Sequence, residues 1–160
     1  MRYSNILKSG AILLLGGVIV AGCTQVNPTL VEVLQSPEIT ARKAVMRGLG
    51  KNMKAMKAAA KAGDNKAVGK AAGKIYKLAG KISKTYKKKT MDGITRAKGN
   101  IWKNMGDFKQ KAEFLAVSAA VLAQVHSKSG NKARIGKAIK NVGKNCGGCH
   151  KVYRAKKKKM

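Results

Sequence analysis

Residues 142–153 of this 160-residue chain are Val-Gly-Lys-Asn-Cys-Gly-Gly-Cys-His-Lys-Val-Tyr, close to its carboxyl end. They contain Cys146, Cys149 and His150 in the spacing C-x-x-C-H, which is typical of c-type haem attachment. Two thiols three residues apart can each bond one vinyl group of haem, and the adjacent imidazole can bind the iron as an axial ligand. The motif therefore predicts one covalent haem c on Cys146 and Cys149, with His150 as the proximal iron ligand.

Other uses of these residues are less favoured. A structural zinc site takes four protein ligands, and beyond Cys146, Cys149 and His150 only His126 is left as a candidate. A thioredoxin-like C-x-x-C would need a strand and a helix around it, but no strand-like segment precedes the motif. A chance match is also weak, because the chain has only three cysteines and two histidines.

Apolar residues spaced three and four apart predict four amphipathic helices. These are expected at about residues 37–62, 64–86, 106–129 and 132–156, with a lysine-rich loop over 87–104. Short turns within the first and last pairs predict an all-α fold, an antiparallel four-helix bundle. Since both motif cysteines continue the apolar stripe of the last helix, the haem is expected on the inner side of the bundle near the carboxyl end.

The stripes also predict which side chains face the core. On the first helix the stripe includes a charged residue, Arg42, and three methionines, Met46, Met53 and Met56, whose helical spacing cannot tell them apart. The other predicted core positions are Ile39, Leu49, Ala60, Val68, Ala72, Ile75, Ala79, Ile82, Phe108, Ala112, Leu115, Ala119, Leu122, His126, Ile135, Ile139, Val142 and Tyr153.

The amino-terminal residues predict export. Arg2 and Lys8 precede an apolar run over residues 11–21, which is too short to span a membrane but suits a signal peptide. Cys23 follows small residues, as in the lipobox of bacterial lipoproteins, so we expect residues 1–22 to be removed and Cys23 to be acylated. The alternative is an ordinary secretory signal.

We expect residues 23–36 to be a tether and 37–160 to be the cytochrome domain. One cysteine for lipid and two for haem leave no thiol for a disulfide. An acyl chain would hold the protein on the periplasmic side of a bacterial membrane rather than through it. Thr24 after the cysteine favours the outer membrane if the cell is Gram-negative.

The stretch from Val142 to Lys156 resembles the carboxyl end of the cytochrome c′ (c-prime) family, the class II c-type cytochromes. Residues 42–53 resemble the opening helix of that family, and residues 99–112 resemble its loop into the third helix. The resemblance covers residues 37–156 and implies one haem c in a four-helix bundle.

The resemblance also implies roles for three further residues. Met46 occupies the place where low-spin members carry a methionine as sixth iron ligand, which makes them electron carriers. Members without that ligand bind nitric oxide or carbon monoxide. Arg42 falls where the family has an arginine at a haem propionate, the alternative being a side chain that reaches solvent at the end of the bundle. Arg154 would border the proximal pocket beside His150.

The net charge is extreme. Removing Arg2 and Lys8 from 35 basic residues leaves 33 against six acidic ones, a formal charge of +27. Such a charge predicts attraction to an acidic redox partner or an anionic membrane surface. A specific nucleic-acid role is disfavoured, because the export signal and the scarcity of aromatic residues both oppose it.

The sequence therefore predicts a non-enzymatic monohaem cytochrome that transfers single electrons and is anchored as a lipoprotein; the resemblance also implies a homodimer. The main alternative is a five-coordinate member that binds nitric oxide or carbon monoxide. The weakest alternative is a basic surface lipoprotein that binds polyanions.

Overall fold

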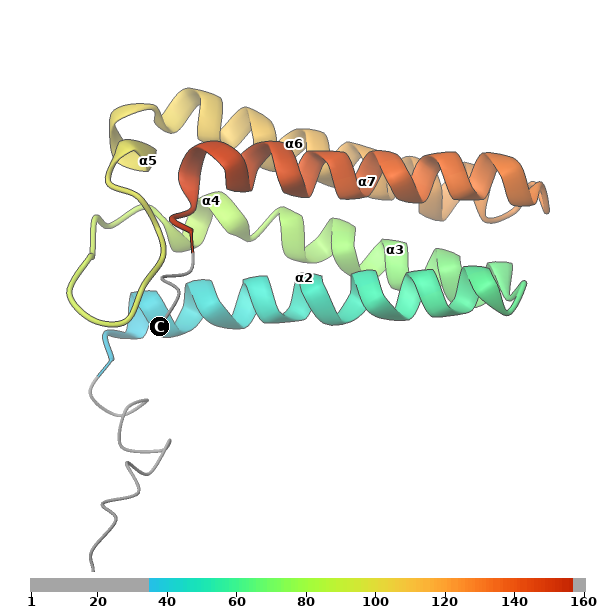
Figure 1. Ribbon diagram of the computed structural model, residues 1–160, viewed down its shortest axis with the longest axis horizontal. Coiled ribbons are helices and arrows are strands. Elements are labelled where there is room, and N and C mark those ends of the chain that lie inside the picture. The colour runs from blue at the N-terminus through green and yellow to red at the C-terminus, as the bar shows by residue number, and fades with distance from the viewer. Residues whose placement is uncertain (1–34, 157–160) are drawn as a thin grey trace, which may run out of the picture.

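The computed structural model describes residues 35–156, which form an antiparallel bundle of four long helices (Figure 1). The predicted signal peptide and the predicted acylation site at Cys23 lie outside the described residues. The helices are α2 (Pro37–Lys61), α3 (Asn65–Ala79), α4 (Ile82–Thr85), α5 (Asn100–Lys103), α6 (Met105–Val121), the π-helix η1 (Leu122–His126) and α7 (Lys132–Tyr153). None of the helices in this part of the chain is long and apolar enough to cross a membrane.

Side-chain caps begin three of the long helices. Ser36 accepts a hydrogen bond from the Ile39 amide at 3.3 Å at the start of α2. Asp64 and Asn131 do the same for α3 and α7. Each cap satisfies an amide that the first helical turn leaves without a partner.

The two tight turns of the bundle each contain a glycine in the left-handed region. Gly63 has a φ of 73° between α2 and α3, and Gly130 has a φ of 66° between η1 and α7. A side chain at either position would be strained. The predicted boundaries at the first turn and at the start of α7 are accordingly confirmed to within one residue, whereas the helix predicted to end at Ser129 ends at His126.

Two predicted helices are interrupted. The second ends at Ala79, because after Gly80 the Lys81 amide bonds the Leu78 carbonyl three residues back, and α4 then begins. The third changes at Leu122 into η1, where the Ser127 amide bonds the Leu122 carbonyl five residues back. The spacing of apolar residues hardly indicates either change, because the chain keeps the direction of the helix through both.

The last helix ends at Tyr153 and not near 156. Beyond it the Ala155 amide bonds the Arg96 carbonyl at 2.8 Å, and the Lys98 amide bonds the Tyr153 carbonyl at 3.0 Å. The chain thus leaves the helix to pair with the long loop before α5. This pairing ties the carboxyl end of α7 to the end of the bundle that holds the haem motif.

The predicted core is largely confirmed, with the exceptions concentrated near the haem motif. The predicted positions on α3 and α4 and most of those on the other long helices are buried. Six predicted inward side chains are instead half-buried: Met46, Met53, Cys146 and Cys149 toward the haem motif, and Ala60 and His126 toward the other end of the bundle.

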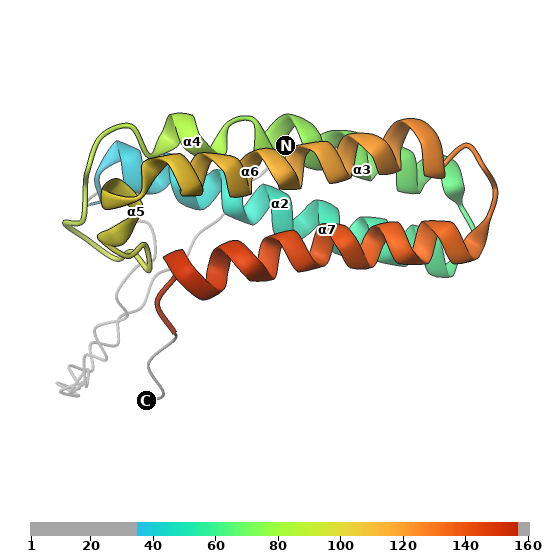
Figure 2. The same cartoon turned by 90° about the horizontal axis from the view of Figure 1, so that it is seen from above.

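Met46, Met53, Cys146 and Cys149 lie on α2 and α7, the two neighbouring long helices that pack least closely. Neighbouring helices in the bundle run α2, α3, α6, α7 around its axis (Figures 1 and 2), and α2 contacts α7 much less than it contacts α3. We call this the α2–α7 seam.

Candidate haem site

The motif cysteines lie on the last two turns of α7. Because they are three residues apart on a helix, Cys146 and Cys149 share one side of it. Both are free thiols, half-buried and packed against the core. Burial raises the pKa of each thiol, so both are held in the protonated form at neutral pH. They are placed side by side for two thioether bonds to one group.

His150 directly follows and is also half-buried. Burial lowers the pKa of its imidazole, and the nearby cations Arg154 and Arg96 act in the same direction. The neutral imidazole that results is the form that binds a metal ion. The Arg154 guanidinium lies 3.3 Å from Nδ1 of His150 and is exposed; that it borders a haem pocket remains a prediction.

A cluster of four aromatic side chains packs beside the motif. Tyr86 lies edge-on to Phe108 at 4.9 Å between ring centroids, and Phe108 lies edge-on to Tyr153 at 5.2 Å. Trp102 completes the cluster and donates its indole N–H to the Tyr86 carbonyl at 2.8 Å. Such edge-to-face pairs add stability beyond the area they bury. The cluster joins the long loop, α6 and the end of α7 at the level of the haem motif.

Tyr153 is fixed at the centre of this contact. Its ring is buried, and its hydroxyl donates to the Asp107 carboxylate at 2.5 Å. Burial, together with the carboxylate, raises the pKa of Tyr153 to about 12. In return the Tyr153 hydroxyl lowers the pKa of Asp107, aided by Lys111, although partial burial opposes the shift.

We expect Asp107→Asn to weaken the dependence of stability on acid pH. Since the pKa of Asp107 is lower in the folded protein, its stabilising contribution is present above the unfolded value of about 4 and is lost as pH falls below it. Urea unfolding midpoints measured between pH 3 and 7 should fall less steeply in the variant. Asp92→Asn, at an exposed loop carboxylate, is the control, and an equal effect of both variants would contradict the prediction.

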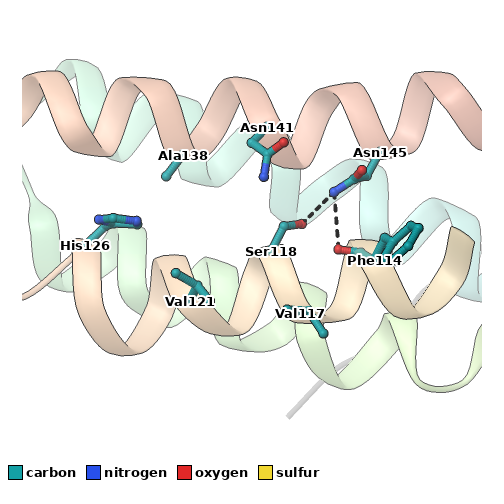
Figure 3. A pocket seen from close by; sticks show the side chains of 8 residues that line it. All are labelled: Phe114, Val117, Ser118, Val121, His126, Ala138, Asn141 and Asn145. Atoms are coloured by element: carbon teal, nitrogen blue, oxygen red, sulfur yellow. Dashed lines mark hydrogen bonds between the residues drawn. The ribbon is translucent and has the colours of Figure 1, made fainter. Parts of the chain in front are cut away.

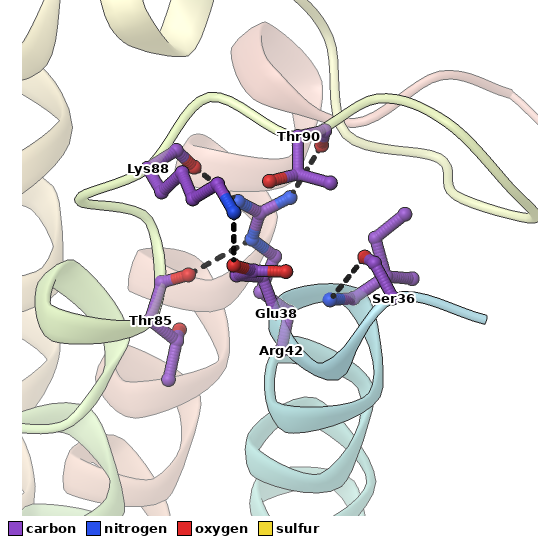
Figure 4. Close-up of polar contacts among 7 residues, drawn as sticks. Ser36, Glu38, Arg42, Thr85, Lys88 and Thr90 are labelled. Atoms are coloured by element: carbon purple, nitrogen blue, oxygen red, sulfur yellow. Dashed lines mark hydrogen bonds and ion pairs between the residues drawn. The ribbon is translucent and has the colours of Figure 1, made fainter.

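Arg42 is buried although it is charged, with an exposed fraction of 2%. Its guanidinium donates to three backbone carbonyls of the loop after α4: Thr85 at 2.9 Å, Lys88 at 2.5 Å and Thr90 at 2.7 Å (Figure 4). It also lies over two aromatic rings, at 4.7 Å from the Tyr86 centroid and 5.2 Å from the Trp102 centroid. Lys88 in addition pairs with Glu38 at 2.9 Å.

These contacts exclude one of the two interpretations of Arg42 and give the side chain a role that the sequence did not reveal. Arg42 does not reach solvent at the end of the bundle, because the loop closes over it. Instead it holds the loop against α2, next to the aromatic cluster. Burial lowers its pKa, but its usual value is so high that the side chain stays charged. That Arg42 also binds a haem propionate remains a prediction.

One contact sets the register of the α2–α7 seam. A Cβ placed on Gly143 would lie 3.4 Å from Cε of Met53, so Met53 packs against α7 at that level. The two helices are antiparallel, so a step back along α2 matches a step forward along α7. Each residue rises about 1.5 Å along a helix.

This register separates the three methionines. Met46 precedes Met53 by seven residues, and His150 follows Gly143 by seven, so Met46 is level with His150. Met53 lies about 10 Å farther along the axis, and Met56 is farther still and fully buried in the core. The structure therefore brings Met46, and neither of the others, to the level of the proximal histidine.

The α2–α7 seam is open at the level between Met46 and Met53. Gly50 is level with Cys146 in the same register, and no atom of another segment lies within 4 Å of where its Cβ would be. Gly147, between the cysteines, likewise has no such atom nearby, whereas Gly148 faces a hollow that it shares with Lys111 and Phe114 of α6. This end of the bundle therefore combines two thiols, a neutral imidazole and a loosely packed seam. That arrangement fits a covalent haem.

His126 does not join this group. It lies at the end of η1, just before the turn into α7 (Figure 3). His150 lies near the other end of α7, about 25 Å away along the helix axis. The Nδ1 atom of His126 is buried without a hydrogen-bond partner. No three His, Cys, Asp or Glu side chains gather around a metal-sized site within residues 35–156, which argues against the zinc alternative there.

A family model for cytochrome c′ matches residues 37–154, the whole bundle with its haem motif. The chain belongs to the cytochrome c′ family. Relatives agree: the cytochrome c′ of Pararhodospirillum photometricum is 33% identical over 125 residues, which are 74% of this chain and 98% of that protein.

A second relative matches over a shorter stretch. Cytochrome c-556 of Agrobacterium tumefaciens (strain apple 185) is 45% identical over 58 residues, 36% of this chain and 44% of that protein. This match spans less than half of the relative. Among solved structures, a cytochrome c′ with a ligand-controlled dimer dissociation is 32% identical with a TM-score of 0.66, covering 76% of this chain and 98% of that one.

Membership of the cytochrome c′ family assigns the cofactor. The protein carries one haem c, covalently attached through the carboxyl-terminal cysteines, in a four-helix bundle. The predictions of fold, family and cofactor are confirmed. The aromatic cluster and the carbonyl contacts of Arg42 were not predicted, because their partners come from a loop whose lysine-rich sequence has no apolar spacing.

Proposed function

We propose that this member of the cytochrome c′ family is a low-spin carrier of single electrons, with His150 and Met46 as the two axial ligands and no substrate chemistry of its own. The observation that carries the proposal is the register of the α2–α7 seam, in which Met46 is level with His150. Haem supplies the one-electron change between ferrous and ferric iron. The protein supplies its attachment, its ligands and its surroundings.

The chemistry of Met46 supports this role. A thioether is a suitable axial ligand that raises the reduction potential of haem iron. Met46 is half-buried at the edge of the core, so its flexible side chain has room to turn toward the seam. Arg42, one turn earlier, packs against the aromatic cluster and would keep that part of α2 in place.

The charge near His150 supports an acidic redox partner. Arg96, Lys151 and Arg154 are all exposed around this end of the bundle. Cations around the edge of a redox centre steer an acidic protein toward it and make the encounter fast and salt-dependent.

We infer a periplasmic location with an acyl anchor at Cys23, from the apolar run and lipobox-like residues alone. An outer-membrane location follows from Thr24 if the cell is Gram-negative. A homodimer is a further proposal: a related cytochrome c′ forms a dimer that dissociates under ligand control. In this chain the lysines oppose association.

The second candidate is a five-coordinate protein that binds nitric oxide or carbon monoxide. It is favoured by the contact of Met46 with the buried core, which would keep the methionine in place as packing, and by the relative named cytochrome c′. In this case the space beside Gly50 would serve the gas.

Absorption spectra of the haem-loaded protein distinguish the two candidates. The oxidised protein, the reduced protein and the reduced protein under carbon monoxide should be recorded. We expect low-spin spectra that carbon monoxide does not change, with a methionine-to-ferric-iron charge-transfer band. A high-spin spectrum that shifts under the gas would replace the electron carrier by the gas binder.

A further inference from the structure

The outer face of α6 differs from the rest of this basic chain. No lysine or arginine occurs between Lys111 and Lys128, a stretch of sixteen residues. Elsewhere between Arg42 and Lys156 no more than six residues separate successive basic residues. The stretch coincides with most of α6 and all of η1.

This stretch is apolar on both of its sides. Leu115, Ala119 and Leu122 face the core, as the sequence predicted. On the opposite side lie four exposed side chains, which we call the α6 outer strip: Phe114 (54% exposed), Val117 (54%), Val121 (42%) and Val125 (56%). A surface helix is normally polar on its outer side, so an exposed apolar strip of this length is unusual.

A groove runs beside the strip, between α6 and α7 (Figure 3). It has a volume of about 330 Å³, and Phe114, Val117 and Val121 line it from α6. Asn145 of α7 crosses it to bond the Ser118 hydroxyl at 3.0 Å and the Phe114 carbonyl at 3.2 Å. The backbone under the strip is therefore held firmly, and its apolar side chains are what remains to be covered.

The border of the strip is positively charged. Phe114 shares a second, smaller hollow with Lys111 and Lys144. The whole of α7, which runs alongside, has six basic residues and no acidic one. On α6 itself Glu113 is the one acid beside the strip. An occupant must therefore combine an apolar interior with a negatively charged boundary.

A second copy of the chain meets these requirements poorly. Four half-exposed side chains offer a few hundred Å² of apolar area, whereas a standard protein interface buries about 800 Å² per partner. The remainder would bring lysine-rich surfaces of two chains together, each with a formal net charge of +29. The repulsion would oppose the dimer.

We propose that the α6 outer strip docks on an anionic lipid surface, with the strip among the upper acyl chains and the lysines of α7 at the headgroups. The four side chains follow one line along the helix, the arrangement of a helix that lies in a membrane interface. Basic residues beside them gain from the negative potential of anionic lipids. The docking is separate from the acyl anchor and needs only the described bundle.

Binding to vesicles tests the proposal. The haem-loaded protein from residue 24 onward, which lacks the predicted signal peptide and acylation site, is mixed with vesicles of phosphatidylethanolamine and phosphatidylglycerol, and bound protein is measured by flotation. In that background Phe114→Gln with Val121→Gln should weaken binding about tenfold or more, because two apolar side chains no longer insert. The control is Met91→Gln with Ile94→Gln, two exposed apolar residues of the long loop, which should change binding less than twofold.

Two further measurements distinguish a lipid surface from a second copy of the chain as the occupant of the α6 outer strip. Binding to neutral phosphatidylcholine vesicles should be much weaker, and haem absorption should show that both double variants are folded. Equal binding by the strip variant and the control would overturn the proposal, leaving lysine attraction alone. A dimer in sedimentation that only the strip variant abolishes, without lipid binding, would overturn it in favour of a second copy.

Discussion

Met46→Ala is expected to convert the haem-loaded protein from a low-spin species that ignores carbon monoxide into a high-spin species that binds it. The reason is the register of the α2–α7 seam, which brings Met46 level with His150. Alanine has no group that could bind iron. The charge-transfer band of the oxidised protein should disappear completely, and the reduced protein should shift on adding the gas.

The chain contains a matched control for this change. Met53 is also half-buried on α2, seven residues away on the same side of the helix, but it packs at Gly143. Met53→Ala removes the same side chain from the same seam and should leave the spin state unchanged. If Met53→Ala gave the high-spin spectrum and Met46→Ala did not, the assignment of the sixth ligand would be wrong. If neither variant changed it, no methionine of the seam would be the ligand.

Arg42→Met is expected to destabilise the fold by about 2–4 kcal/mol, the range for leaving buried polar groups without partners. Methionine keeps much of the volume but donates to none of the three loop carbonyls. The contacts of the guanidinium with Tyr86 and Trp102 would be lost as well. Urea unfolding of the haem-loaded protein, followed by helical circular dichroism, measures the loss.

Two variants test whether the geometry of Arg42 matters and not its charge alone. Arg42→Lys keeps the charge but lacks the planar fork that reaches three carbonyls, so it should recover only part of the stability. Lys51→Met removes a cation from the exposed side of the same helix and should cost less than about 0.5 kcal/mol. A full recovery by lysine would show that the loop needs the charge and not the three bonds.

Much of the site follows from local patterns in the sequence. The C-x-x-C-H spacing and the position of the cysteines on an apolar stripe are properties of one helix, so haem attachment and the bundle were both predictable. Arg42 was also recognised as unusual, because a charge on an apolar stripe needs a partner. Its partners were not predictable, since backbone carbonyls of a lysine-rich loop leave no trace in the residue types.

The break at Gly80 and the π-helix at Leu122 illustrate a different limit of prediction from the sequence. Each changes the hydrogen bonding by one or two residues while the apolar side chains still reach the core. Packing decides between such alternatives, and the spacing of apolar residues changes too little to reveal the choice. Together they explain why the predicted helix positions agree with the structure while the predicted continuity of two helices does not.

The sequence by itself determined the class of fold and the attachment residues Cys146 and Cys149, and it predicted His150 as the ligand, because these depend on spacing within single helices. Helical spacing alone left Met46, Met53 and Met56 equivalent, and only the resemblance singled out Met46. The tertiary structure distinguishes them physically, because the contact between Met53 and Gly143 sets how two antiparallel helices align. Tertiary structure also decided that Arg42 closes a loop and that α6 presents an uncovered apolar strip. Both depend on which distant segments pack beside a residue.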